Sequence, residues 1–252
     1  MSSVDVLILL VGGAFAGIIN AMAGGGSTLT VPLLVLAGVP GVAANGSNRV
    51  GILTSTMTSL ASFRQEGHHV RPRELVPIIT PAIVGSLVGA FGISQLTDDT
   101  FETVFGLLII PVIILTINKP KANLDAKQWP LATTLIVFFF IGIYAGAIQA
   151  GVGLVLLAAL SRSGLDLVTA NVIKVAFTFA VTLIALPVFI IQGDVRWGPA
   201  IVLAIGLSIG GWFGAKLAVR GGEKWIRVVM TVAAIALALR LLGFYGWLAN
   251  VF

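Results

Sequence analysis

One stretch of the sequence decides the fold class: Asn20-Ala21-Met22-Ala23-Gly24-Gly25-Gly26-Ser27-Thr28, which lies inside a long apolar region. A related stretch, Gln149-Ala150-Gly151-Val152-Gly153, follows about 126 residues later. In each copy a polar side chain precedes a cluster of glycines. A single cation then follows in the next apolar segment, Arg49 in the first copy and Lys174 in the second. The sequence therefore predicts an internal repeat, with one half of a shared site in each copy.

The composition predicts an all-α, polytopic membrane protein. The chain of 252 residues is 58% hydrophobic and 10% charged, and its mean hydropathy is +1.06. Soluble domains carry about 25% charged residues, so this chain could not cover itself against water. The absence of cysteine excludes disulfides and thiolate metal sites. We expect about 8–10 spans from ten apolar segments: 4–23, 26–39, 43–63, 75–95, 101–118, 130–150, 153–161, 166–191, 197–218 and 225–243.

The loop charges predict the topology, because basic loops tend to face the cytoplasm. The expected inner loops share an excess of cations: Arg64, Arg71, Arg73, Lys119, Lys121, Lys127, Arg162, Lys216, Arg220, Lys224 and Arg227. The expected outer loops are acidic or nearly neutral and contain Asp98, Asp99, Glu102, Asp194 and Arg196. Corresponding loops then lie on opposite sides of the membrane. We therefore expect two inverted repeats of five crossing or half-crossing helices, residues 1–122 and 123–252, with both termini outside.

The segments 26–39 and 153–161 are too short to cross a ~30 Å hydrocarbon core upright. Each could span, or could form a hairpin with the preceding segment that turns at the glycine cluster. Glycine tolerates positive φ and close backbone approach. A helix beginning after each cluster would present unpaired N–H groups that attract anions, and Ser27 and Thr28 are suited to cap it. The alternative role of glycine is helix packing, which we expect for the pairs Gly85/Gly89 and Gly210/Gly214.

Polar side chains gather on one face of two apolar segments. Long cationic side chains can reach the headgroup layer, but a grouped polar face favours contact with protein or water. Every Asp and Glu lies in a loop or at a segment end, so the two cations lack an acidic partner and indicate an anionic ligand. The candidate ligand-binding residues are Asn20, Gly24, Gly25, Gly26, Ser27, Thr28, Asn45, Asn48, Arg49, Gln149, Gly151, Gly153, Asn171 and Lys174.

The run from Asn20 to Leu34 resembles the first glycine motif of the sulfite exporter TauE/SafE family, also called the toluene sulfonate uptake permease group. The run Gly151-Val152-Gly153-Leu154 resembles the weaker second copy of that motif, with Val152 where glycine is expected. The run Gly193-Asp194-Val195-Arg196-Trp197 is similar to the family's loop before the penultimate span. The similarity covers nearly the whole chain. It implies a secondary transporter of small sulfur-containing anions such as sulfite or sulfonates.

These observations predict a carrier that moves a small anion by alternating access and binds it between the repeats, near the midplane. An anion channel is the alternative, since a pore could use the same cations. No enzyme activity, metal or other cofactor is expected, because no segment contains a nucleophile–base pair or a metal cluster. The expected partners are the anion, membrane lipid and a coupling proton or ion; a homo-oligomer remains open, and nucleic acid is not expected. The expected location is the bacterial cytoplasmic (inner) membrane.

Overall fold

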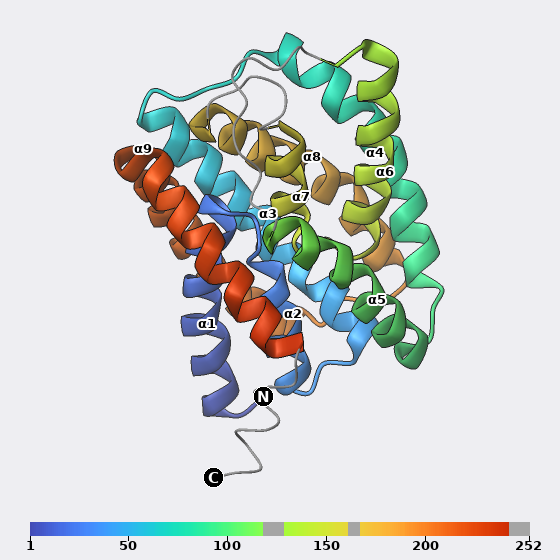
Figure 1. Ribbon diagram of the computed structural model, residues 1–252. Helices are drawn as coiled ribbons and strands as arrows, with labels where there is room; N and C mark the ends of the chain where they lie inside the picture. The colour runs from blue at the N-terminus through green and yellow to red at the C-terminus, as the bar shows by residue number, and fades with distance from the viewer. Residues whose placement is uncertain (118–128, 161–166, 242–252) are drawn as a thin grey trace.

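The structure of the chain is a computed structural model that describes residues 1–117, 129–160 and 167–241. The described residues form α-helices and no β-strand, as the sequence predicts. A helix suits apolar surroundings because it satisfies its own backbone N–H and C=O groups where water is absent. In chain order the helices are α1 (Ser3–Met22), α2 (Ser27–Leu36), α3 (Gly41–Gln65), α4 (Pro72–Ser94), α5 (Asp98–Ile117), α6 (Leu131–Ala147), α7 (Val152–Leu160), α8 (Leu167–Ile191) and α9 (Trp197–Leu241) (Figure 1).

The last helix differs from the prediction in how its two parts are joined. We expected two segments, 197–218 and 225–243, separated by a basic loop. The structure instead has helical backbone from Trp197 to Leu241, through Gly221 and Gly222. The part of α9 before these glycines runs in the same direction as α1, since Gly206 lies against Leu10 and Gly214 against Ile18, and the part after them runs back toward the end of the molecule where α1 begins (Figure 1). Adjacent glycines are positions where a helix can bend sharply, so the two predicted segments are present as the two arms of α9, and helical backbone at Gly221 and Gly222 joins them in place of the expected loop (Figure 1).

The outer surface of the helices is apolar. Four of the described helices are long and apolar enough to cross a membrane: Ser3–Met22, Arg73–Ser94, Val168–Ile191 and Trp197–Gly221. Large apolar side chains on them are more than half exposed, among them Leu7, Phe15, Phe91, Ile205 and Phe213. An apolar surface of this extent suits lipid and not water. Together with the composition, these features define an integral membrane protein.

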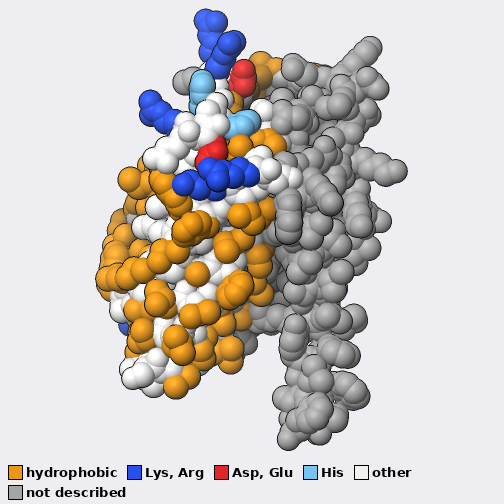
Figure 2. Space-filling model, turned by 90° about the vertical axis from the view of Figure 1, so that its left-hand side faces the viewer, with side chains coloured by type: hydrophobic (Ala, Val, Ile, Leu, Met, Phe, Trp, Pro, Cys, Tyr) orange, Lys and Arg blue, Asp and Glu red, His pale blue; other side chains and the backbone are white. Residues whose placement is uncertain are grey.

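The loop after α3 lies at one end of the molecule. The chain's two histidines, His68 and His69, lie there with Lys and Arg side chains, above an apolar flank (Figure 2). This arrangement is typical of a basic loop in the headgroup or aqueous layer beside a lipid-facing surface. Of the other predicted inner-loop cations, Lys119, Lys121, Lys127 and Arg162 lie outside the described residues, as does the expected boundary between residues 122 and 123.

Two pairs of helices pack through small residues. The helices α1 and α9 lie side by side, and so do α4 and α6 (Figure 1). A Cβ added to Gly210 or Gly214 of α9 would meet the α1 backbone within 3.0 Å, and one added to Gly85 or Gly89 of α4 would meet the α6 backbone. The glycines therefore permit close backbone approach. The packing role predicted for both glycine pairs is confirmed.

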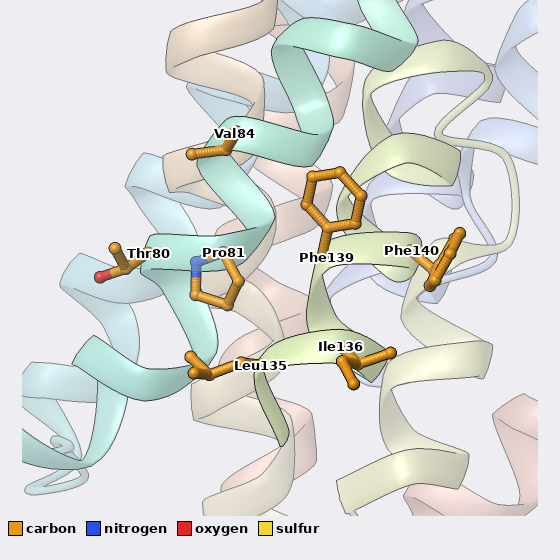
Figure 3. A pocket seen from close by; sticks show the side chains of 7 residues that line it. All are labelled: Thr80, Pro81, Val84, Leu135, Ile136, Phe139 and Phe140. Carbon is orange, nitrogen blue, oxygen red and sulfur yellow. The ribbon is translucent and has the colours of Figure 1, made fainter. Parts of the chain in front are cut away.

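A groove of about 430 Å³ lies between α4 and α6 on the outer surface (Figure 3). Its lining is apolar except for one hydroxyl and consists of Thr80, Pro81, Val84, Leu135, Ile136, Phe139 and Phe140. None of these side chains carries a charge. The groove therefore offers nothing to balance an ionic ligand, and the predicted site residues lie elsewhere, in the interior.

Candidate functional site

Two helix breaks lie at the glycine clusters predicted from the sequence. The first separates α1 from α2, and the second separates α6 from α7. Gly24 and Gly151 turn the chain with φ of +81° and +71°, a conformation that glycine adopts at little cost. The helices α2 and α7 have 10 and 9 residues, so each is about 15 Å long or less and cannot cross a ~30 Å core. Each glycine cluster is thus the turn of a helical hairpin with one short arm.

The two breaks touch each other. A Cβ added to Gly24 would collide with the backbone of Gly153, and a Cβ added to Gly153 would collide with that of Gly24. The Lys174 side chain also lies here, since its Cδ is 3.0 Å from the position of a Cβ on Gly24. The glycines of both clusters are buried. The helix breaks of the two copies therefore form one buried region, which we call the centre.

Several backbone N–H groups of the centre have no hydrogen-bond acceptor within the described part of the chain. The amide of Gly24 continues the hydrogen-bond pattern of α1, because it donates to the carbonyl of Asn20 at 2.9 Å. The amides without an acceptor lie at the start of the two short helices: Gly25, Gly26, Ser27, Gly151 and Gly153. They are the unsatisfied donors that every helix N-terminus has. Buried and at the positive end of a helix dipole, they suit an anion.

The hydroxyl groups of the first break do not cap α2 as the sequence predicted. The N-cap residue is Gly26, which makes no side-chain cap, and Ser27 is the first helical residue. The Thr28 hydroxyl donates to the carbonyl of Gly25 at 2.6 Å. The prediction of hydroxyl caps is therefore wrong, and the amides stay unpaired.

Arg49, on α3, binds the end of α6. Its side chain is fully buried, and its guanidinium donates to the carbonyls of Ala145 at 3.2 Å, of Gly146, and of Ala147 at 3.1 Å. The ring of Phe189 lies 4.5 Å from the guanidinium carbon. These carbonyls are the last of α6 and form the negative end of its dipole. A cation of the first copy thus caps the C-terminus of a helix in the second copy.

Lys174, on α8, caps the C-terminus of α1 in the same way. Its ammonium donates to the carbonyls of Asn20 at 2.7 Å and Ala21 at 3.0 Å, and it is buried. The sequence predicted cations without a partner, facing helix N-termini. The structure corrects this, because each cation contacts the carbonyl end of the helix before a break. In a region without acids, helix C-terminal carbonyls are the strongest acceptors at hand.

Amide side chains flank the two cations, as predicted. Asn45 donates through Nδ2 to the last carbonyl of α6 at 2.7 Å, and Asn48 accepts through Oδ1 from a hydroxyl on α2 at 2.5 Å. Gln149 donates through Nε2 to a hydroxyl on α8. Each of these three keeps one amide atom without a partner among the described residues. Asn171 is completely buried, and neither of its amide atoms has such a partner.

The centre carries a net positive charge. No Asp or Glu is among the buried residues in the described part of the chain. The salt bridge found within that part, Arg220 to Glu66 at 3.1 Å, includes an arginine that is largely exposed. The two helix ends at each break carry opposite dipole charges of about half a unit and roughly cancel. What remains is the charge of the two cations, together with unpaired N–H donors.

Three contributors to the centre were not predicted: Thr30, Thr182 and Phe189. A signal existed for Thr182, because Lys174, Thr178 and Thr182 recur every four residues and so share one face of α8. Thr30 donates to Asn48, and Phe189 stacks on Arg49. Neither of these two forms a pattern in the sequence, since each contact depends on how distant helices pack.

The fold and the centre define a class of protein: a polytopic α-helical membrane protein in which two broken helical hairpins meet at a buried cationic site. The model of one family, described as sulfite exporter TauE/SafE, matches residues 9–241. This match covers nearly the whole chain. The chain therefore belongs to the sulfite exporter TauE/SafE family and is a membrane transporter of that family.

Curated relatives from three bacteria are similar along nearly their whole length. The chain is 27% identical over 239 residues to a probable membrane transporter protein, ORF9, of a Sinorhizobium species, covering 93% of this chain and 91% of the relative. It is 25% identical over 249 residues to a probable membrane transporter protein of Haemophilus influenzae, covering 97% of each. It is 25% identical over 232 residues to the probable membrane transporter protein YfcA of Escherichia coli, covering 90% and 86%. No solved structure matches the chain.

Proposed function

We propose that this transporter carries a small oxyanion, such as sulfite or a sulfonate, by alternating access between two inverted repeats. The observation that carries the proposal is the buried centre, where unpaired N–H groups of both glycine clusters lie with Arg49 and Lys174. Donors fixed in a buried site bind negative oxygens strongly, above all when the donor is charged. No buried carboxylate repels the anion in the described part of the chain.

Both cations keep a donor for the anion while they hold the helix ends. The Nε of Arg49 has no partner among the described residues. Lys174 has three N–H donors, as every ammonium does, and two of them bind carbonyls. The Nδ2 atoms of Asn48 and Asn171 are also unpaired within that part of the chain. The anion would thus add to the existing contacts without having to replace them.

Two loops with the same hydrogen bond support the inverted repeat. After α3, Gly67 has φ of +82°, and the amide of His68 donates to the carbonyl five residues earlier at 2.9 Å. After α8, Gly193 has φ of +78°, and the amide of Asp194 donates to the carbonyl five residues earlier at 2.8 Å. The matching residues are about 126 positions apart. The helix pair α1/α9 likewise corresponds to α6/α4, since each joins the first helix of one repeat to the fourth of the other.

The contacts across the repeats support alternating access. Arg49 of the first repeat holds α6 of the second, and Lys174 of the second holds α1 of the first. A movement of one repeat against the other therefore acts on both half-sites at once. Alternating access requires this coupling, because one central site must face the two sides of the membrane in turn.

A cavity of about 510 Å³ lies where α4, α6, α7 and α8 meet. Its lining includes the exposed charged residues Arg73 and Glu74 and the buried Ile173, which directly precedes Lys174. We assign this cavity as the approach to the centre from the cytoplasm, because basic loops mark that side. Since the relatives are bacterial, we place the protein in the cytoplasmic membrane with both termini outside.

Transport in proteoliposomes tests the proposal. Vesicles that contain the wild type should take up radiolabelled sulfite or a sulfonate with saturation, and unlabelled substrate inside should accelerate the uptake by counterflow. Arg49→Gln and Lys174→Gln should each weaken binding by about 10-fold or more, since each removes a charged donor. The control is Arg220→Gln, which removes an exposed cation outside the centre.

The possible outcomes separate the two functions considered. Uptake that does not saturate and shows no counterflow would indicate a channel and contradict the carrier. Unchanged anion affinity in both Arg49→Gln and Lys174→Gln would contradict the assignment of the centre as the binding site.

A further inference from the structure

We propose that the transported anion carries a hydrogen-bond donor, an O–H or N–H group, in addition to its negative oxygens. This inference rests on the proposed function and narrows its substrate class to hydroxy- or amino-substituted oxyanions and singly protonated oxyanions. It follows from unpaired acceptors in a centre that otherwise offers donors. Among the described residues these acceptors are Oδ1 of Asn45, Oε1 of Gln149 and Oδ1 of Asn171.

The orientation of the Asn45 amide follows from its neighbour. Its Nδ2 lies 2.7 Å from the carbonyl oxygen of Ala147. A carbonyl oxygen only accepts, so the amide must present its NH2 group there. The amide therefore cannot be rotated by 180°, and the positions of its oxygen and nitrogen are fixed. The Asn45 side chain is fully buried and keeps an acceptor without a donor in the described part of the chain.

The Gln149 amide is fixed by the same reasoning. The hydroxyl of Thr182 donates its proton to the carbonyl of Thr178 at 2.6 Å. Its oxygen can then only accept, so Gln149 must direct its NH2 group to it. The Gln149 oxygen is left as a buried acceptor. Gln149 also has φ of +61° and is the non-glycine residue with positive φ in the described part of the chain, so a side chain is present where the backbone favours glycine.

Asn171 leads to the same conclusion in either orientation. Neither amide atom has a partner among the described residues, so turning the amide exchanges one unpaired donor and one unpaired acceptor. The three acceptors belong to Asn45 on α3, which contacts the last carbonyl of α6, to Gln149 in the break between α6 and α7, and to Asn171 on α8, one turn before Lys174. An anion without a donor would leave them unpaired and would bring its own negative oxygens near them. Both effects oppose binding.

Ordered water is the competing occupant, because water donates as well as accepts. Water would satisfy the acceptors equally well beside any anion. A substrate donor, in contrast, makes affinity depend on the ligand's own O–H or N–H group. The comparison of ligands that have the same size and differ in one donor therefore separates the two.

The experiment measures the affinity of the purified full-length protein for matched anions by calorimetry. One pair is 2-hydroxyethanesulfonate and propane-1-sulfonate, and the other is lactate and 2-methylpropanoate. In at least one comparison the form with the donor should bind about 10-fold or more tightly, since its counterpart leaves a buried acceptor unpaired.

Equal affinity within every comparison overturns the proposal and leaves anion binding intact. No binding of any of these anions contradicts the proposed function itself. Gln149→Met, which removes the acceptor at similar length, should reduce the preference for the donor-bearing anion by about 10-fold, while Gln95→Met, at an exposed amide after α4, should leave it unchanged. The ratio of the wild-type protein's affinities for the two anions of each matched pair decides the proposal even where a variant does not fold.

Discussion

Arg49 and Lys174 bind helix ends in the structure and, in the proposed function, an anion as well. A buried cation without partners would be strongly unfavourable, and the carbonyls of α6 and α1 provide those partners. The charge of each side chain therefore contributes to the stability of the fold as well as to the proposed binding.

Replacement of Arg49 by Gln should lower the free energy of unfolding by about 2 kcal/mol or more, because buried carbonyls lose their donor. Thermal or denaturant unfolding in detergent measures this change. Arg220→Gln is the matched control, since it removes an exposed ion pair worth about 0–1 kcal/mol. Equal losses in the two variants would contradict the role of Arg49 as a helix cap.

Gly24→Ala should be far more harmful than Gly38→Ala, although both glycines have nearly the same backbone. Their φ values are +81° and +80°, so each alanine costs about 1–2 kcal/mol from the left-handed conformation. A Cβ on Gly38 meets nothing within 4 Å, whereas one on Gly24 collides with Gly153. We expect Gly24→Ala to unfold at a temperature several degrees lower and to lose transport. Similar melting temperatures would show that the two breaks do not touch.

The sequence was sufficient to find the charged residues of the centre but not their partners. A cation or an amide inside an apolar segment stands out, which is why Arg49, Lys174 and Asn171 could be identified. The acceptors of Arg49 are backbone atoms 96 to 98 residues away, and those of Lys174 lie 153 and 154 residues away. Backbone carbonyls have no sequence signature, and only the packing of the helices brings them to the cations.

At the scale of helices, the position of a glycine decides its role. Gly89 and Gly92 lie on the same helix, α4, one turn apart. A Cβ on Gly89 would collide with the backbone of α6, whereas one on Gly92 meets nothing within 4 Å. Gly89 is therefore needed for the contact between two helices, and Gly92 only lowers the helix propensity of α4.

Gly89→Ala should destabilise the protein, and Gly92→Ala should stabilise it slightly. The second substitution gains up to about 1 kcal/mol of helix propensity, while the first forces α4 and α6 apart. Melting temperatures in detergent give the sign of each effect. A stabilising Gly89→Ala would contradict the close packing of the two helices.

The loop after α8 rests on the start of α3. The amide of Arg196 in this loop donates to the Ser47 hydroxyl of α3 at 2.8 Å. Asp98, the first residue of α5, also contacts the start of α3, because its carboxylate accepts from the amide of Val42 at 2.9 Å. Partial burial raises the pKa of Asp194, the negative charge of Asp98 raises it further, and Arg196 lowers it. A carboxylate held in this way binds its proton more tightly in the folded protein than in the unfolded chain.

Stability should therefore fall as the pH rises from about 4 through the raised pKa of Asp194, and level off above it. Asp194→Asn should remove this decline, because an amide does not titrate. Melting curves recorded at a series of pH values, from about 4 to above the raised pKa of Asp194, test the effect. Asp99→Asn, at an exposed carboxylate of the same end, is the control and should keep the wild-type decline.

The helix bounds show which elements a sequence can define. The glycine clusters interrupt long apolar segments, and the predicted breaks after α1 and α6 are present. The two segments predicted on either side of residues 218–225 are present as oppositely directed parts of α9 (Figure 1), and only the loop between them is replaced by helical backbone at Gly221 and Gly222. Glycine and basic residues are typical both of a loop and of a sharp bend in a helix, and the two cannot be distinguished by composition.

At the scale of the whole molecule, the inverted repeat predicts that the loops after α3 and after α8 lie on opposite sides of the membrane. The chain has no cysteine, so single cysteines can be introduced without background. Gln65→Cys and Gln192→Cys place exposed thiols at the end of α3 and just after α8. In right-side-out vesicles, an impermeant maleimide should label only Gln192→Cys, and in inverted vesicles only Gln65→Cys. Labelling of both from one side would contradict the inverted repeat.

The contacts of Arg49 and Lys174 also bear on how the protein is made. Arg49 reaches the membrane before the α6 carbonyls that it binds have been translated, and the end of α1 precedes Lys174 by an even longer stretch of chain. Until the late half inserts, Arg49 lacks these acceptors, so its charge favours a hydrated or headgroup position for this side chain. Two halves produced from separate genes would each carry an open helix end, and each would mature only in a membrane that contains the other.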